Sequence, residues 1–260
     1  TAHRAQSADQ RGREGVSWDT LVFRLPDDGT GALPLLRHVI VNDAKASTYK
    51  LGLLRAVTRI ADGVPGMVIR RTDDRVEIPF GVVGLYWLKL YQPLILGHEL
   101  RQVQGRANYA FAREAFNALR ALSPLDLRVG QRLNSEWAQT VLHAIRDACD
   151  TIAEMPAHYT TYPGTRTPIF EPEPPVANRR FRAQPAMLDR DTLLRFGRFR
   201  IPAHVWDCCS RYACWLEPAI VNEWVDLMQT YNGVRYSGDT FQTALRWEEG
   251  RRDTSHVRRL

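Results

Sequence analysis

One apolar stretch dominates the chain: Ile78-Pro79-Phe80-Gly81-Val82-Val83-Gly84-Leu85-Tyr86-Trp87-Leu88-Lys89-Leu90-Tyr91-Gln92-Pro93-Leu94-Ile95-Leu96. Pro79, Lys89, Gln92 and Pro93 interrupt it, which leaves about a dozen continuous apolar residues, fewer than the ~20 that a membrane-spanning helix needs. The stretch therefore predicts a helix buried in the core of a globular protein, and no membrane partner is expected.

Apolar residues at helical spacing on both sides of this stretch predict further helices, with Ser47 as the N-cap of the second and a bend at Pro218 in the last. They cover residues 33–41, 47–63, 106–122, 134–155 and 206–231. Alternation of residue types predicts a β-hairpin and one later strand. The hairpin covers residues 67–71 and 75–78, and the strand covers residues 194–202.

Proline content divides the chain, because seven of its 15 prolines lie between residues 156 and 185. A segment so rich in proline sustains neither a helix nor a central strand. We therefore expect a flexible N-terminus at 1–17, a helical domain with a small hairpin at 18–155, a proline-rich extended strap at 156–188 and a C-terminal helical part at 189–260. Residues 18–25 are expected to form a short strand or a turn of helix. The fold class is mainly α with short β elements (α+β).

The composition is that of an ordinary globular protein, with 44% hydrophobic and 25% charged residues among 260. A net charge of +6 favours an anionic partner, of which nucleic acid is the commonest. The four cysteines follow no secretory signal, so we expect free thiols and a cytoplasmic location. The chain begins without Met and stops inside a basic run at 251–260, which suggests a fragment of a longer protein.

Only three of the 35 basic residues are lysines, and Lys45 and Lys50 lie together at the start of the helix predicted at 47–63. A helix N-terminus favours anions, so these lysines with Ser47 and Thr48 form a candidate phosphate site. The same helix carries two arginines on its polar face, Arg55 and Arg59. An ordinary helix start with solvated lysines is the alternative interpretation.

Arginines alternate with phenylalanines in two later segments, Arg179-Arg180-Phe181-Arg182 and Arg195-Phe196-Gly197-Arg198-Phe199-Arg200. Guanidinium groups bind phosphates and aromatic rings stack on bases, so this pattern predicts nucleic-acid contact, with Arg198 and Arg200 as candidates. The alternative is that an arginine-rich protein carries arginine on every solvated face.

No catalytic or metal site follows from the sequence. His204, Cys208, Cys209 and Cys214 lack the paired spacing of a zinc site and are better explained as core thiols beside a histidine. The chain has no His-Glu-x-x-His motif, no phosphate loop ending in Gly-Lys-Ser/Thr and no Gly-x-Ser-x-Gly elbow. We therefore expect no cofactor in this chain, although an enzyme whose site forms only on folding stays open.

Three segments resemble the N-terminal, non-catalytic region of bacterial HNH endonuclease domain-containing proteins. They are residues 33–51, Met155-Pro156-Ala157-His158-Tyr159-Thr160-Thr161-Tyr162-Pro163-Gly164 and Tyr212-Ala213-Cys214-Trp215-Leu216-Glu217-Pro218-Ala219-Ile220. The resemblance spans most of residues 18–255. It implies a DNA-cleaving protein of restriction or anti-phage defence, whose nuclease module would follow residues 251–260 and use a divalent metal. An HNH site needs two histidines and an asparagine on one ββα unit. The seven histidines here are scattered, so no catalytic residue carries over.

We therefore expect a region that binds nucleic acid, DNA in preference, and positions a nuclease. Its expected contact residues are Lys45, Ser47, Thr48, Lys50, Arg55, Arg59, Arg198 and Arg200. The alternative is a helical scaffold that binds protein partners or a second copy of itself through the predicted helix at Trp206–Tyr231.

Overall fold

The computed structural model describes residues 30–105, 108–175, 181–233 and 236–246. The expectations for residues 1–17 and 18–25 lie outside these ranges. The longer helices are α2 (Tyr49–Gly63), α3 (Phe80–Gln92), α5 (Ser135–Glu154), α8 (Ala203–Arg211) and α9 (Ala213–Asn232). The shorter helices are α1 (Ala32–Arg37), α4 (Glu114–Ala118), α6 (Pro156–Tyr159), α7 (Arg190–Leu194) and α10 (Gly238–Ala244).

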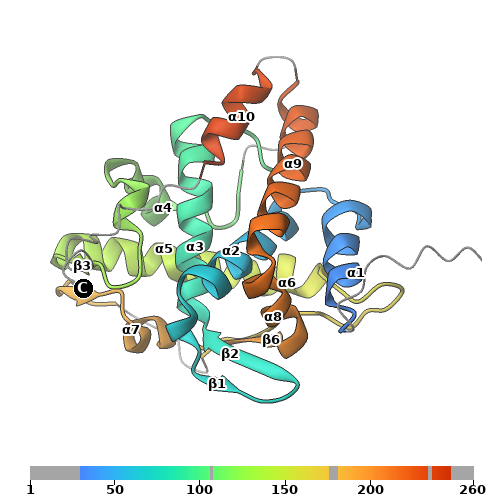
Figure 1. Ribbon diagram of the computed structural model, residues 1–260. Coiled ribbons are helices and arrows are strands. Elements are labelled where there is room, and N and C mark those ends of the chain that lie inside the picture. The colour runs from blue at the N-terminus through green and yellow to red at the C-terminus, as the bar shows by residue number, and fades with distance from the viewer. Residues whose placement is uncertain (1–29, 106–107, 176–180, 234–235, 247–260) are drawn as a thin grey trace, which may run out of the picture.

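The strands are short and antiparallel, so the predicted class, mainly α with short β elements, is confirmed (Figure 1). One sheet has the order β1-β2-β6-β4, and a second pairs β3 with β5. The first sheet contains β1 (Arg70–Arg71), β2 (Arg75–Pro79), β6 (Arg198–Pro202) and β4 (Glu171–Glu173). The second contains β3 (Arg132–Leu133) and β5 (Ala186–Met187). The predicted hairpin is present as β1 and β2, with a first strand shorter than expected.

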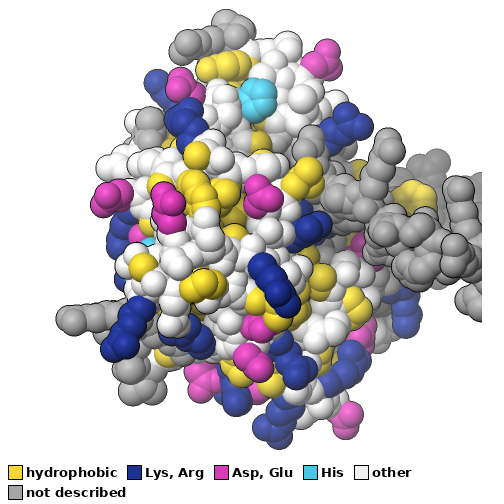
Figure 2. Space-filling view, turned by 90° about the vertical axis from the view of Figure 1, so that its left-hand side faces the viewer, with side chains coloured by type: hydrophobic (Ala, Val, Ile, Leu, Met, Phe, Trp, Pro, Cys, Tyr) yellow, Lys and Arg dark blue, Asp and Glu magenta, His cyan; other side chains and the backbone are white. Residues whose placement is uncertain are grey.

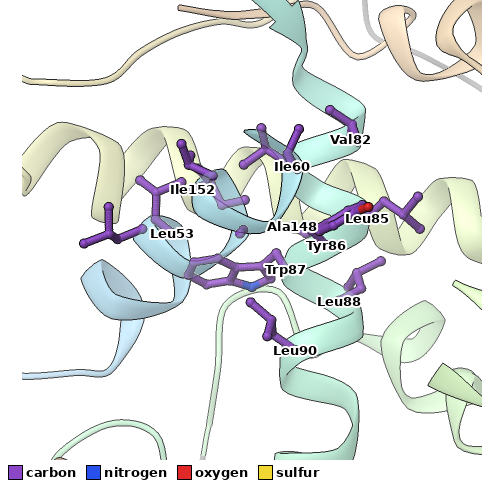
Figure 3. Packing of buried hydrophobic residues seen from close by; sticks show 14 of the residues in the cluster. Leu53, Ile60, Val82, Leu85, Tyr86, Trp87, Leu88, Leu90, Ala148 and Ile152 are labelled. Atoms are coloured by element: carbon purple, nitrogen blue, oxygen red, sulfur yellow. The ribbon is translucent and has the colours of Figure 1, made fainter. Parts of the chain in front are cut away.

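Helix α3 forms the centre of the core, as its sequence predicts. All thirteen of its residues are buried. Figure 3 shows Trp87 of α3 with Leu53 and Ile60 of α2 on one side and Ala148 and Ile152 of α5 behind them. A helix that is apolar on every side must be surrounded by other elements, because any exposed side would leave apolar surface in water.

Elements from both ends of the chain pack around α3. Strand β2, which leads directly into α3, pairs with β6, with Ile78 opposite Phe199. Helix α2 packs against α3, α8 and α9. Side chains from before and after the predicted boundary at residue 156 therefore share one hydrophobic core. None of the helices in the described ranges is long and apolar enough to cross a membrane.

The prediction of a helix at 106–122 is wrong for most of that range. The structure has only α4 and a short 3-10 turn at Leu119–Ala121 within the described part of this range. Phe111 lies instead in a non-helical segment, where its ring contacts Tyr49, Trp87 and Tyr91 with centroid distances of 6.0, 5.7 and 5.3 Å. Packing of these aromatic rings overrides the local helical propensity.

The prediction of a single helix at 206–231 is wrong. The structure has two helices there, because the helical conformation is interrupted at Tyr212 between α8 and α9. Pro218, the expected bend, lies inside α9 near its start. The break allows α8 and α9 to make separate contacts with α2. The predicted N-cap also differs: α2 begins after Thr48, and Ser47 Oγ accepts only a long hydrogen bond of 3.4 Å from the Tyr49 N–H.

The first turn of α3 lies directly against α7. A Cβ atom added at Gly81 would meet the Leu193 carbonyl oxygen at 2.5 Å and the Leu193 Cα at 3.0 Å. Both atoms are backbone, so a larger residue must displace a whole helix rather than a flexible side chain.

We expect Gly81→Ala to lower the free energy of unfolding by about 1–3 kcal/mol, the usual cost of overpacking a core. Urea denaturation measures this change. Gly63→Ala is the matched control, because a Cβ at the end of α2 meets nothing within 4 Å and alanine suits a helix better than glycine. Equal stability of Gly81→Ala and the wild type would contradict the close approach of α3 and α7.

Candidate nucleic-acid interface

Both predicted lysines at the start of α2 form ion pairs with acidic side chains. Lys50 Nζ lies 2.5 Å from Asp43 Oδ2. Lys45 Nζ donates to the Asp43 carbonyl oxygen at 2.9 Å and lies 3.5 Å from Glu223 Oε1. Burial lowers the pKa of Lys45, and Glu223 partly offsets this effect. The two ammonium groups therefore already have anionic partners within the protein.

Thr48, beside them, belongs to the interior. Its hydroxyl is buried, donates to Gln102 Oε1 at 2.9 Å and lies 3.0 Å from the Tyr91 hydroxyl. Gln102 Oε1 also accepts from Trp224 Nε1 at 2.9 Å. Thr48 thus helps to satisfy a buried polar network between α2, α3 and α9 and does not face solvent.

Arg55 and Arg59 bind a single carboxylate. Arg55 Nε donates to Glu217 Oε1 at 3.0 Å, and Arg59 Nη2 pairs with Glu217 Oε2. The Arg55 side chain is only 2% exposed. Its burial lowers the pKa of Arg55, while the Glu217 carboxylate raises it. Glu217 lies on α9, so this double ion pair connects α2 to α9.

Arg198 and Arg200 lie on β6 rather than on α2. The structure therefore does not join them to Lys45 and Lys50 at the start of α2, which we call the lysine segment. Arg200 Nε donates to Glu77 Oε1 at 3.1 Å and its Nη2 donates to Glu173 Oε2 at 2.7 Å. Arg198 Nη1 lies 3.4 Å from Glu77 Oε2. These are cross-strand pairs, which stabilise a sheet.

The phenylalanines that were expected to stack on bases are inside the protein. Phe181, Phe196 and Phe199 are at most 4% exposed. Phe181 stacks on Phe196 with a centroid distance of 5.1 Å. The prediction that these rings stack on bases is wrong, because all three rings are buried in the hydrophobic core.

The thiols near His204 are also structural. Cys208 and Cys209 are buried, and burial raises the pKa of the Cys209 thiol to about 12. A neutral thiol is a poor metal ligand. No group of three or more His, Cys, Asp or Glu side chains within the described ranges is arranged to hold a metal ion.

Another set of arginines is exposed to solvent around the small β3–β5 sheet and α7. Arg128, Arg132, Arg182, Arg190 and Arg195 are all exposed, and we call them the arginine face. In the part of the chain that the structure describes, none of them forms an ion pair with a carboxylate. Asp126, Asp189 and Asp191 lie within two residues of Arg128 or Arg190 in the sequence, but among the described residues none of the three forms an ion pair with the arginine face.

The arginine face is assembled by pairing between distant segments. Arg132 lies opposite Met187 in the β3–β5 pair, and α7 follows β5 directly. The Arg195 guanidinium lies 4.9 Å from the centre of the Phe181 ring, which brings Arg195 close to Arg182. Figure 2 views this side of the molecule and shows Lys and Arg side chains spread over its lower half, with some acids between them. No local spacing in the sequence predicts this grouping.

A mixed-charge cavity of about 350 Å³ lies beside the four-stranded sheet. Its charged residues largely neutralise one another, since Arg75 pairs with both Glu171 and Asp74. It contains His204 but no serine or cysteine nucleophile among its described lining residues. It therefore offers no recognisable catalytic chemistry.

The sequence matches a family model over residues 29–245, which is most of the chain. The chain belongs to the family described as domain of unknown function DUF8808. No curated protein and no solved structure matches it. Membership covers α1 to α10, and so includes the lysine segment, the Glu217 bridge and the arginine face.

We expect Glu217→Gln to lower the free energy of unfolding by about 3–5 kcal/mol, because it leaves the buried Arg55 guanidinium without its counter-charge. Chemical denaturation measures the loss. Asp207→Asn is the matched control: it removes the partner of Arg71 in a pair whose side chains are 51% and 45% exposed, and such pairs contribute less than about 1 kcal/mol. Similar stabilities of the two variants would refute a structural role for the bridge.

Proposed function

We propose that this chain binds nucleic acid, DNA in preference, through the arginine face. The observation that carries the proposal is a group of five exposed guanidinium groups without carboxylate partners among the described residues. Guanidinium groups form two parallel hydrogen bonds with phosphate and stay charged at any physiological pH. The net charge of +6 supports an anionic partner in general.

The arginine face is a better phosphate contact than the lysine segment. A phosphate that binds Lys50 must displace Asp43, and one that binds Arg59 must compete with Glu217. Binding at the arginine face breaks no ion pair among the residues that the structure describes. Its cost is therefore limited to desolvation and to the ordering of exposed side chains.

The proposed role within a larger protein is the positioning of a nuclease module on DNA, as the resemblance to HNH endonuclease domain-containing proteins implies. The described residues offer no catalytic pair, so cleavage and its divalent metal would belong to that module. The coding sequence that follows Leu260 tests this part: an HNH motif supports it, and a stop codon contradicts it.

Replacing Arg132, Arg190 and Arg195 together with Gln should weaken binding to a duplex of any sequence. Each lost phosphate contact should reduce the slope of log K against log[salt] by about 1. Fluorescence anisotropy with a labelled duplex at several salt concentrations measures both quantities.

The matched control replaces Lys50, Arg71 and Arg75 together with Gln, which removes three charges from residues that already have acidic partners. We expect a smaller loss of affinity and a nearly unchanged salt slope for this control. An unchanged slope in the triple variant would refute the arginine face. A larger loss of affinity in the control than in the triple variant would place the contact at the residues of the control and would also refute the arginine face.

A second candidate function, protein interaction, is favoured by one specific observation. Trp215 on α9 is 76% exposed, while Trp206, Trp224 and Tyr231 of the same predicted helix are buried. Beside it lies an apolar groove of about 300 Å³ between α1 and α9, lined by Leu33, Pro34, Arg37, Ile40, Val41, Leu216 and Ala219. An exposed tryptophan next to an apolar groove is typical of protein-binding surfaces.

If copies of this chain associate through this groove, Trp215→Ser should shift the population towards monomer. Sedimentation velocity at low and high protein concentration measures the shift. Exposed Met187 lies away from the groove, so Met187→Ser serves as the control. Monomeric wild-type protein at high concentration would exclude self-association.

A further inference from the structure

The small sheet formed by β3 and β5 has one face in the core and one face in solvent. Leu133 is 6% exposed and belongs to the hydrophobic core, and Ala186, its cross-strand partner, packs against the same core. Arg132 and Met187, the other pair, are both exposed. Side chains alternate along a strand, and residues directly opposite each other lie on the same face. Arg132 and Met187 therefore project side by side into solvent.

Backbone hydrogen bonds continue this pairing beyond the two strands. The Gly130 N–H donates to the Leu188 carbonyl oxygen, and the Leu188 N–H donates to the Gln131 carbonyl oxygen, each at 2.9 Å. We call residues 130–133 together with residues 186–188 the ribbon. In Figure 1, β3 lies at the left edge of the molecule. The ribbon is thus a two-stranded element at the edge of the fold whose outer face carries Arg132 and Met187.

Exposed arginines lie beyond both ends of the ribbon. Arg128 and Arg190 each lie two residues beyond one end in the sequence. Arg182 lies four residues before the other end, and the contact of Arg195 with the Phe181 ring brings Arg195 close to Arg182. In the part of the chain that the structure describes, none of these four arginines forms an ion pair with a carboxylate. An anionic partner can therefore be held at both ends of the ribbon.

Met187 distinguishes the outer face of the ribbon from a purely cationic surface. It is 39% exposed, and of the five large hydrophobic side chains exposed in the described ranges it is the one that pairs across strands with a residue of the arginine face. A single exposed methionine is common on protein surfaces, but a thioether beside a guanidinium group gains nothing from a phosphate. Base edges offer both hydrogen-bond acceptors and an apolar methyl group. Methionine adapts well to such a contact because its side chain is flexible and polarizable.

The major groove of DNA matches the size and the charge of the ribbon. The groove is about 12 Å wide and admits a two-stranded ribbon, whose strands lie about 4.8 Å apart, whereas the minor groove is only about 6 Å wide. Guanine presents two acceptors in the major groove that fit one guanidinium group, and thymine presents its methyl group there. The phosphates on both sides of the groove can meet the arginines at both ends of the ribbon. The major groove of an RNA duplex is too narrow for such an element, so DNA is the better partner.

We propose that the ribbon enters the major groove of DNA and recognises bases there, with Arg132 on a guanine and Met187 on a thymine methyl group. Opposite residues of a sheet have Cβ atoms about 5 Å apart, and successive base pairs are about 3.4 Å apart, so the two contacts fall on neighbouring base pairs. The other four arginines of the arginine face hold the phosphates. This inference rests on the proposed function and adds a sequence preference to DNA binding at the same surface.

Selection of tightly bound duplexes from a randomised pool, with the full chain, shows whether a sequence preference exists. We expect enrichment of guanine beside thymine. Fluorescence anisotropy then compares the selected duplex with two derivatives. Uracil in place of thymine removes only the methyl group and should weaken binding by about fourfold, the effect of one buried methyl group. Deazaguanine that lacks N7, in place of guanine, removes one acceptor and should weaken binding by about tenfold.

Two single variants assign these contacts to their residues. Met187→Ala should lose the discrimination between thymine and uracil and keep that between guanine and deazaguanine, and Arg132→Gln should do the reverse. Met155→Ala is the matched control and should keep both. Met155 is 43% exposed, and it lies beyond the far end of α5, a 20-residue helix about 30 Å long that begins beside β3. All three side chains are exposed, so folded variants are expected.

The outcomes separate this proposal from the proposed function. Binding to duplexes without enrichment of any sequence would overturn base recognition and leave phosphate binding at the arginine face intact. The absence of binding to any duplex would overturn both. Discrimination between thymine and uracil that survives in Met187→Ala, or that disappears in Met155→Ala, would place the methyl contact elsewhere and would also overturn the assignment to the ribbon.

Discussion

The burial of α3 on all sides is the constraint on which the rest of the structure depends. A surface helix needs one apolar stripe, but every residue of α3 is buried, so it must be enclosed by partners in all directions. Helices α2 and α5 supply two of these partners, and the β2–β6 pair holds its N-terminal end, where the Phe80 N–H donates to the Gly197 carbonyl oxygen at 2.9 Å. Segments more than a hundred residues apart must therefore meet around one helix. This requirement makes the two ends of the chain parts of one core.

The second organising principle is the use of arginine as a structural cation. Glu217 binds two arginines of α2, and Glu77 binds two arginines of β6. Removing Glu217 would leave the buried charge of Arg55 without a partner, which is costly, whereas an exposed pair such as Arg71 with Asp207 contributes little. An arginine-rich sequence therefore carries two populations of guanidinium groups. One forms ion pairs within the fold, and the other, on the arginine face, stays available to external anions.

Sequence patterns predicted the fold well where one interaction dominates. The buried helix at α3, the amphipathic helix at α5 and the hairpin of β1 and β2 all follow from hydrophobic periodicity and turn residues. The predictions were wrong where distant contacts compete with local preference. Phe111 leaves the helical pattern to join the aromatic cluster of Tyr49, Trp87 and Tyr91, and the chain breaks at Tyr212 so that α8 and α9 can both reach α2. Neither event has a signal within its own segment.

The sequence by itself determined the fold class, the central helix and the excess of positive charge, because these depend on composition and on the spacing of residues within single elements. Only the tertiary structure decided which charges are free. Lys50 and Arg59 look like ligands for phosphate in a linear reading, but Asp43 and Glu217 neutralise them once the chain is folded. Arg132 and Arg195 look ordinary in the sequence, yet the β3–β5 pair and the contact with Phe181 place them on one exposed face. The physical reason is that the strength of a charge as a binding group depends on its neighbours in space.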